Sequence, residues 1–135
     1  MSERVGFIGL GIMQVVEPLN PNDAPGYFLP TPSMGFRLVE EIDHPNLFLE
    51  YDVYHAQRTE GDLVNTIKKK LDRIGHIQIA DSPNRNEPGT GEINYPFVFA
   101  AIDQTAYAGW VSLEYRPSGT TEDSLSWLRE WGYFS

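Results

Sequence analysis

The sequence contains no cysteine and is poor in positive charge. The absence of cysteine excludes disulfide bonds, thiolate nucleophiles and cysteine-based zinc sites. Only 10 lysines and arginines stand against 19 aspartates and glutamates, for a net charge of -9. Nucleic-acid-binding proteins normally show the opposite balance or a basic stripe. The one dense basic run, Lys68 to Lys70, falls within a helical pattern, so we interpret it as a solvated helix face, with an anion-binding patch as the alternative.

Long hydrophobic runs are missing too. No segment approaches the length of apolar sequence that crosses a bilayer. The residues after Met1 form only a short apolar stretch broken by glycines, whereas a signal peptide needs a longer apolar core. We therefore expect a cytoplasmic protein without membrane partners. A length of 135 residues with 41% hydrophobic content allows one compact domain.

Short apolar runs alternate with segments of helical periodicity along the chain. The predicted strands are 5–8, 15–16, 47–53, 77–80 and 110–115, and the predicted helices are 31–42, 63–74, 96–102 and 120–131. Strands separated by helices indicate parallel pairing with right-handed crossovers. The sequence therefore predicts an α/β fold, a partial (half) TIM-type (β/α) barrel of about four β/α units with one extra N-terminal strand.

Four polar side chains stand near the carboxyl ends of consecutive predicted strands. They are Glu17, Asp52, Gln78 and Glu114, at separations of 35, 26 and 36 residues. Each separation is about one strand–helix unit, so these positions are equivalent on neighbouring strands. Because successive side chains of a strand point to opposite faces, the polar residues share one face and the apolar ones, such as Ile77, lie under the helices. We expect the four side chains to converge at one end of the sheet.

Three carboxylates and an amide oxygen are a suitable ligand set for a hard divalent cation such as Mg²⁺ or Mn²⁺. Any one of them alone is as well explained by a solvated loop start. Four in matched register favour a site, and active sites of such barrels lie at the carboxyl ends of the strands. We therefore predict a metal site formed by Glu17, Asp52, Gln78 and Glu114.

Two nearby groups are candidates for substrate binding. His55 follows Asp52 by three residues and would reach the same rim, although a lone histidine after a strand is often a structural hydrogen-bonding group. Arg85 and Glu87 lie in the polar loop after the third of these strands. An arginine there can clamp a carboxylate with two hydrogen bonds, and a surface ion pair is the alternative.

Several ordered motifs stand along the chain: Glu17–Asn20, Tyr51–His55, His76–Asp81, Glu87–Pro96, Gly109–Val111 and Glu114–Pro117. They resemble the hydroxypyruvate isomerase family, within the broader group of xylose-isomerase-like barrels, and the likeness runs from about residue 14 to about residue 131. The resemblance is to the carboxyl-terminal half of the family. It implies a metal-assisted interconversion of hydroxypyruvate and 2-hydroxy-3-oxopropanoate.

The resemblance also implies roles for individual residues. Glu17 and Glu114 match the acid/base carboxylates and also bind the metal, together with Asp52 and Gln78. Related epimerases carry a histidine at the place of Gln78. His55 and Arg85 match substrate-binding positions, and we assign Glu87, in the same loop as Arg85, to this group.

The first residues resemble a different family. Residues 4–13 are similar to the start of a beta-hydroxyacid dehydrogenase, such as tartronate semialdehyde reductase. Gln14 stands where that motif needs its third glycine, and no dinucleotide-binding unit follows. We therefore divide the chain into a dehydrogenase-like segment, 1–13, and a half-barrel domain, 14–135, and expect no nucleotide cofactor.

A closed barrel of this type has eight strands, so a half-barrel has open sheet edges. We expect a homo-oligomer that covers these edges. The expected ligand is a small sugar acid, and no nucleic-acid partner is expected. The alternative to an active isomerase is a non-catalytic half-barrel, such as a self-associating fusion product without turnover.

Overall fold

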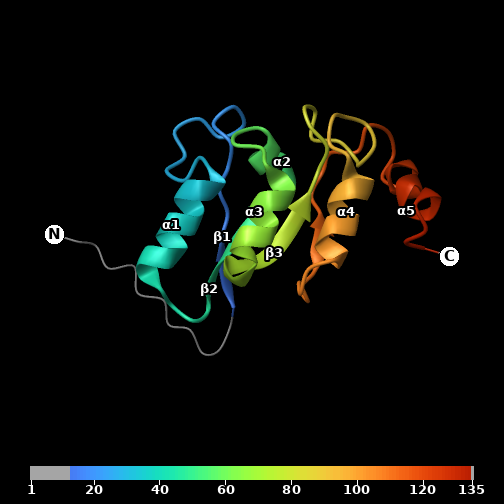
Figure 1. The fold of residues 1–135 in the computed structure, drawn as a ribbon. Helices are drawn as coiled ribbons and strands as arrows, with labels where there is room; N and C mark the ends of the chain where they lie inside the picture. Colours follow the sequence, from blue (N-terminus) through green and yellow to red (C-terminus); the bar gives the residue numbers. More distant parts are fainter. Residues whose placement is uncertain (1–12, 135) are drawn as a thin grey trace.

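In a computed structural model, which describes residues 13–134, one four-stranded sheet forms the centre of the chain (Figure 1). Its strands are β1 (Gln14–Val16), β2 (Leu47–Asp52), β3 (Ile74–Ile79) and β4 (Val111–Leu113). They pair in the order β1-β2-β3-β4, and every pair is parallel. This arrangement confirms the predicted α/β half-barrel.

Helices connect the strands, as parallel pairing requires. They are α1 (Pro32–Ile42), α2 (Val53–Gln57), α3 (Leu63–Lys70), α4 (Tyr95–Asp103) and α5 (Ser126–Glu130), with single 3₁₀ turns at η1 (Leu71–Arg73) and η2 (Asp123–Leu125). In Figure 1, α1, α3 and α4 lie side by side on one face of the sheet, and α2 lies with the loops that follow the strands. Among residues 13–134, the opposite face of the sheet carries no helix.

Helix α1 begins where the sequence predicts. The Thr31 hydroxyl accepts a hydrogen bond from the Met34 N–H at 3.4 Å, and Pro32 occupies the first helical position, where its missing N–H costs nothing. Phe36 and Val39 are buried against the sheet. Cap and apolar stripe thus agree, which explains why this helix is predictable from sequence.

The boundary between α3 and β3 differs from the prediction. The predicted helix 63–74 includes Ile74, but Ile74 is the first residue of β3. Leu71 and Ile74 are three residues apart, a spacing that fits a helix, while Ile74 also belongs to the buried core beside Ile77 and Ile79. The periodicity of a short apolar run does not separate the two alternatives.

The two faces of the sheet have opposite character, as predicted. Leu49, Tyr51 and Ile77 are buried at 0–1% exposure and pack under the helices. On the other face, Asp52 is in register with Gln78, and Gln78 with Ser112. The side of the sheet without helices is therefore polar toward the carboxyl ends of its strands.

Two sequence expectations fall at the limits of the described residues. The predicted strand at 5–8 and most of the dehydrogenase-like segment lie outside them.

Within residues 13–134, none of the helices has the length and apolar character that crossing a membrane requires. In the same range, β1 and β4 each pair with only one strand, so each leaves an open edge.

Candidate metal and substrate site

The four predicted metal ligands lie at the carboxyl end of the sheet. Glu17 directly follows β1, Asp52 ends β2, Gln78 is the penultimate residue of β3, and Glu114 directly follows β4. The Glu114 N–H donates to the Ile79 carbonyl at 3.1 Å, which continues the pairing beyond β4. Parallel register thus brings residues up to 97 positions apart in the chain to one edge.

Asp52 accepts hydrogen bonds with Oδ1, whereas Oδ2 has no hydrogen-bond partner. Its Oδ1 accepts hydrogen bonds from the N–H groups of Tyr54 at 2.7 Å and His55 at 3.4 Å, and so caps α2. This cap fixes the position of the carboxylate, and the helical turn that it begins places the His55 ring beside the Asp52 side chain. His55 Nε2 lies 3.7 Å from Asp52 Oδ2 and 3.8 Å from Glu17 Oε1. Glu17, Asp52 and His55 thus form a group whose ligand atoms lie within 4.8 Å of one another.

The other nitrogen of His55 defines the tautomer of the ring. The backbone N–H of Asn20 donates to His55 Nδ1 at 3.1 Å, and the Asn20 side-chain nitrogen lies 2.7 Å from the same atom. A nitrogen that accepts a hydrogen bond carries no proton, so in neutral His55 the proton is on Nε2. His55 therefore presents an N–H donor to Glu17 and Asp52.

Four buried polar atoms in this group have no hydrogen-bond partner. They are Glu17 Oε1, Asp52 Oδ2, His55 Nε2 and Gln78 Oε1. Native proteins leave few such atoms unpaired, because each loses its hydration without compensation. Three of the four are oxygens, the atom type that Mg²⁺ and Mn²⁺ prefer. The free oxygens fit a cation, and the free N–H fits an acceptor on a substrate.

Burial and mutual repulsion disfavour the charged forms of these groups. Desolvation, followed by the charges of Asp52 and Glu114, raises the pKa of Glu17 to about 8. Desolvation raises the pKa of Asp52 to about 6, although the Tyr54 N–H and the charge of Arg85 act in the opposite direction. For His55, desolvation and then the charge of Arg85 lower the pKa to about 4. A positive charge among the carboxylates would relieve this electrostatic cost.

Arg85 partly supplies that charge. Its guanidinium donates a hydrogen bond to Glu114 Oε2, and Nη2 lies 3.5 Å from Asp52 Oδ2. Arg85 is thus in the cluster that the sequence predicts. Glu87 is engaged elsewhere: its carboxylate accepts hydrogen bonds from the N–H and hydroxyl of Ser118. That contact joins the loop after β3 to the loop after β4.

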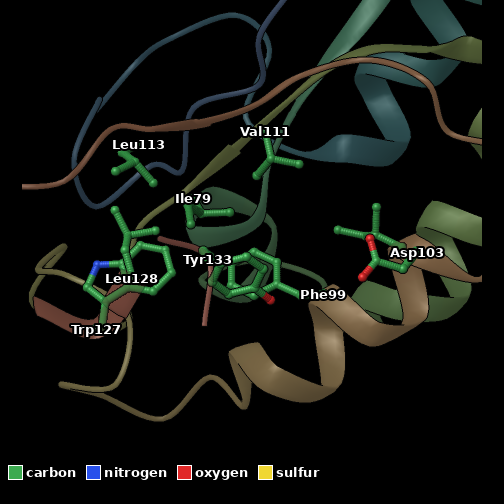
Figure 2. A pocket seen from close by; sticks show the side chains of 9 residues that line it. Ile79, Phe99, Asp103, Val111, Leu113, Trp127, Leu128 and Tyr133 are labelled. Atoms are coloured by element: carbon green, nitrogen blue, oxygen red, sulfur yellow. The ribbon is translucent and has the colours of Figure 1, made fainter. Parts of the chain in front are cut away.

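A separate apolar cavity lies on the helix side of the sheet. It has a volume of about 200 Å³ and is lined by Ile79, Phe99, Ile102, Asp103, Val111, Leu113, Trp127, Leu128 and Tyr133 (Figure 2). Ile79 and Leu113 are opposite in strand parity to Gln78 and Glu114. The cavity is therefore on the other face of the sheet from the carboxylates, and it holds only one ionisable carboxylate.

Sequence reasoning missed Asn20. It is fully buried, and its side chain also donates to Asp23 at 3.1 Å. Asn20 and His55 are 35 residues apart, and nothing in either local pattern indicates that they meet. The sequence signal for Asn20 is its place at the end of the Glu17–Asn20 motif, and that motif does not indicate a partner.

Known proteins of similar sequence match most of this chain. The family described as xylose isomerase-like TIM barrel matches residues 9–131. The chain is 47% identical to hydroxypyruvate isomerase of Escherichia coli over 117 residues, which is 87% of this chain and 45% of that protein. It is 43% identical to 2-oxo-tetronate isomerase of Cupriavidus necator over 88% of this chain and 46% of that protein.

Solved structures share the fold of this chain. An AP endonuclease, family 2, from Brucella melitensis superposes with a TM-score of 0.86 at 42% identity, over 90% of this chain and 47% of that one. A 3-keto-D-glucoside 4-epimerase from E. coli superposes with a TM-score of 0.77 at 29% identity, over 89% of this chain and 46% of that one. The chain spans just under half the length of each of these relatives.

Proposed function

Because the chain belongs to the xylose isomerase-like TIM barrel family, we propose that it corresponds to the carboxyl-terminal half of a hydroxypyruvate isomerase and carries the metal and substrate site of that enzyme. In this role it interconverts hydroxypyruvate and 2-hydroxy-3-oxopropanoate with a bound Mg²⁺ or Mn²⁺. Relatives named hydroxypyruvate isomerase and 2-oxo-tetronate isomerase support an isomerase-like function. The observation that carries the proposal is the group of buried, unpartnered oxygens at the carboxyl ends of adjacent strands.

The cation would be held by Glu17, Asp52, Gln78 and Glu114. Oxygens of the first three lack hydrogen-bond partners, while Glu114 is half-exposed and engages Arg85. His55 is not in this set, because the nitrogen that it turns toward the carboxylates carries a proton. When bound, a divalent cation polarises the substrate carbonyl and stabilises the negative charge that develops on its oxygen.

The reaction moves one proton between neighbouring carbons. The carbon that carries the hydroxyl of hydroxypyruvate loses a proton, its hydroxyl proton passes to the neighbouring oxygen, and the former carbonyl carbon gains a proton. Glu17 and Glu114 stand on the outermost strands of the sheet, on either side of Asp52 and Gln78. One of these glutamates removes the proton and the other returns it.

The substrate would be oriented by three further groups. His55 Nε2–H donates a hydrogen bond to a substrate oxygen, since the Asn20 contact leaves that proton free. Arg85 binds the carboxylate of the sugar acid, a task suited to its planar pair of donors. Glu87 acts indirectly: its hydrogen bonds with Ser118 join the loop that carries Arg85 to the loop after β4.

Turnover of hydroxypyruvate by the purified chain in the presence of Mn²⁺ tests the proposal. Glu114→Gln keeps the shape of the side chain but removes the base, so we expect turnover to fall by about 10²–10⁴-fold. Glu41→Gln is a matched control, because Glu41 is an exposed residue in the last turn of α1, away from the carboxyl ends of the strands. Equal turnover in the Glu114→Gln variant and the wild type would refute the assignment.

A self-associating half-barrel without turnover is the second candidate, and the edges of β1 and β4 that are unpaired among residues 13–134 are the observation behind self-association. Unpaired strand edges bind further strands readily. Trp110, at 84% exposure beside β4, adds apolar surface to one edge. In both candidates we propose that a second copy covers the edges. Light scattering of the purified chain tests this: a dimer or larger species is expected, and a monomer at micromolar concentration would contradict it.

A further inference from the structure

Asp81 is a buried carboxylate that the proposed chemistry does not use. It lies two residues beyond the end of β3 and is 1% exposed. Its Oδ1 accepts from the N–H groups of Ser82 at 2.9 Å and Ile93 at 3.1 Å. Its Oδ2 accepts from those of Gly89 and Gly91, both at 2.9 Å. One side chain thus binds both ends of the loop 82–93.

The carboxylates of Asp81 and Asp52 differ in whether an oxygen remains without a hydrogen-bond partner. Both oxygens of Asp81 are engaged by two backbone N–H groups each, whereas Asp52 Oδ2 has no hydrogen-bond partner. Hydrogen bonds from N–H groups to a carboxylate are stronger than those between neutral groups. Asp81 is therefore placed to hold backbone, and Asp52 to bind a ligand.

The backbone of Asp81 holds the segment that contains Arg85. The Arg85 N–H donates to the Asp81 carbonyl at 2.9 Å, and the Asp81 N–H donates to the Asn86 carbonyl at 2.8 Å. Arg85 has a φ of 59°, in the left-handed region that residues other than glycine adopt at a cost. The surrounding loop has to enforce that conformation. The Arg116 N–H, which donates to the Arg85 carbonyl at 2.7 Å, is one further restraint.

We propose that Asp81 is a positioning residue that places the Arg85 guanidinium at the metal and substrate site. Through its four N–H contacts it fixes the loop 82–93, and the fixed loop holds the guanidinium against Glu114 and 3.5 Å from Asp52 Oδ2. The effect on substrate rests on the proposed function, because it assumes that Arg85 binds the carboxylate of a sugar acid. The effect on the loop does not.

Two variants disturb this anchor in different ways. Asp81→Asn keeps the size of the side chain but replaces one acceptor oxygen with an NH₂ group that faces N–H donors. Gly91→Ala places a Cβ 2.0 Å from the Ser82 carbonyl oxygen and 2.7 Å from Asp81 Oδ1, so the loop has to move. The matched controls are Asp103→Asn, an exposed aspartate of α4, and Gly119→Ala, whose Cβ meets nothing within 4 Å.

Trypsin reports on the loop without any need for turnover. The Arg85–Asn86 bond is a trypsin site within the loop, and the folded loop protects it. We expect cleavage at this bond to be about tenfold faster or more in both loop variants, because losing hydrogen bonds to a charged group opens the loop more often. Cleavage in the two controls should stay within about twofold of the wild type. Unchanged cleavage in both loop variants would overturn the proposal.

Binding measurements separate positioning from general damage. In Asp81→Asn we expect the affinity for Mn²⁺ to stay within about threefold of the wild type, while the KM for hydroxypyruvate rises about tenfold or more with a smaller change in kcat. If Asp81→Asn does not fold, Gly91→Ala is judged by the same two criteria. Faster cleavage with an unchanged KM would refute the positioning role. Absence of turnover in the wild-type chain would refute the proposed function. The cleavage rates would then test the role of Asp81 in fixing the loop 82–93.

Discussion

The backbone N–H of Asn20 donates a hydrogen bond to Nδ1 of His55 at 3.1 Å. The nitrogen of His55 that faces the carboxylates is therefore protonated in the neutral ring, and a protonated nitrogen cannot bind a metal. We predict that His55→Ala leaves the affinity for Mn²⁺ within about threefold of the wild type and raises the KM for hydroxypyruvate about tenfold, the loss expected for one good hydrogen bond.

Calorimetric titration with Mn²⁺ measures the first effect, and initial rates measure the second. Asp52→Asn is the matched comparison, because it removes a carboxylate charge from the proposed ligand set and should weaken Mn²⁺ binding strongly. A drop of tenfold or more in Mn²⁺ affinity for His55→Ala would show that His55 is a metal ligand and that its tautomer changes on binding.

The raised pKa of Glu17 makes stability depend on pH. The folded-state pKa is about 8 against a usual value of 4.5, so the folded chain binds more protons than the unfolded chain between these values. Stability in the metal-free chain therefore falls as pH rises through this window. Below pH 6.5 the shifts of Asp52 and His55 act in opposite directions, and as the pH rises further toward 8 His55 becomes neutral in the unfolded state as well as in the folded state.

Between pH 6.5 and 8 we therefore expect a loss of about 1–2 kcal/mol in the free energy of unfolding, since one pKa unit corresponds to about 1.4 kcal/mol. Urea denaturation in the presence of a chelator measures it. Glu17→Gln should abolish the loss, because the amide does not titrate. A wild-type chain as stable at pH 8 as at pH 6.5, or a variant that keeps the same pH dependence, would contradict the account.

In the proposed metal site Gln78 would contribute a neutral amide oxygen, a ligand that favours hard cations. Gln78→His replaces it with an imidazole nitrogen, a donor that suits zinc and other later transition metals. We predict that this variant binds Zn²⁺ and Co²⁺ more tightly relative to Mg²⁺, by about tenfold or more. Competition titrations provide the measurement. Unchanged metal preference would indicate that Gln78 is not a ligand.

The core beneath the site is buried, and Ile79 also borders the apolar cavity on the helix side of the sheet. Ile79 is fully buried between β4 and the helices, whereas Leu125 is 37% exposed. We expect Ile79→Ala to lower the free energy of unfolding by about 2–5 kcal/mol. For Leu125→Ala, at the surface, we expect a loss below about 1 kcal/mol. Similar losses in both variants, measured by urea denaturation, would mean that β3 does not form the core.

The general arrangement of the site was predictable because it depends on local pattern. Leu49 and Tyr51 alternate with Glu50 and Asp52, so both the strand and the face that carries Asp52 can be predicted from the sequence. Parallel pairing then implies that Gln78 lies beside Asp52, as the register confirms.

The contacts that refine the site were not predictable. Asp52 caps a five-residue helix, which is too short for hydrophobic periodicity to predict it from the sequence. Asn20 meets His55 across 35 residues, and Asp81 binds N–H groups up to 12 residues away. Such hydrogen bonds depend on how loops fold over the sheet, which single-sequence periodicity does not encode.

The central claim is that the oxygens of Glu17, Asp52, Gln78 and Glu114 bind a divalent cation. A thermal melt of the chain with Mn²⁺ and with a chelator tests it most directly, since a ligand that binds only the folded state raises the midpoint. We predict a cooperative transition that shifts upward by several degrees with Mn²⁺ in the wild type and does not shift in Asp52→Asn. The same midpoint in both conditions for the wild type would contradict the account.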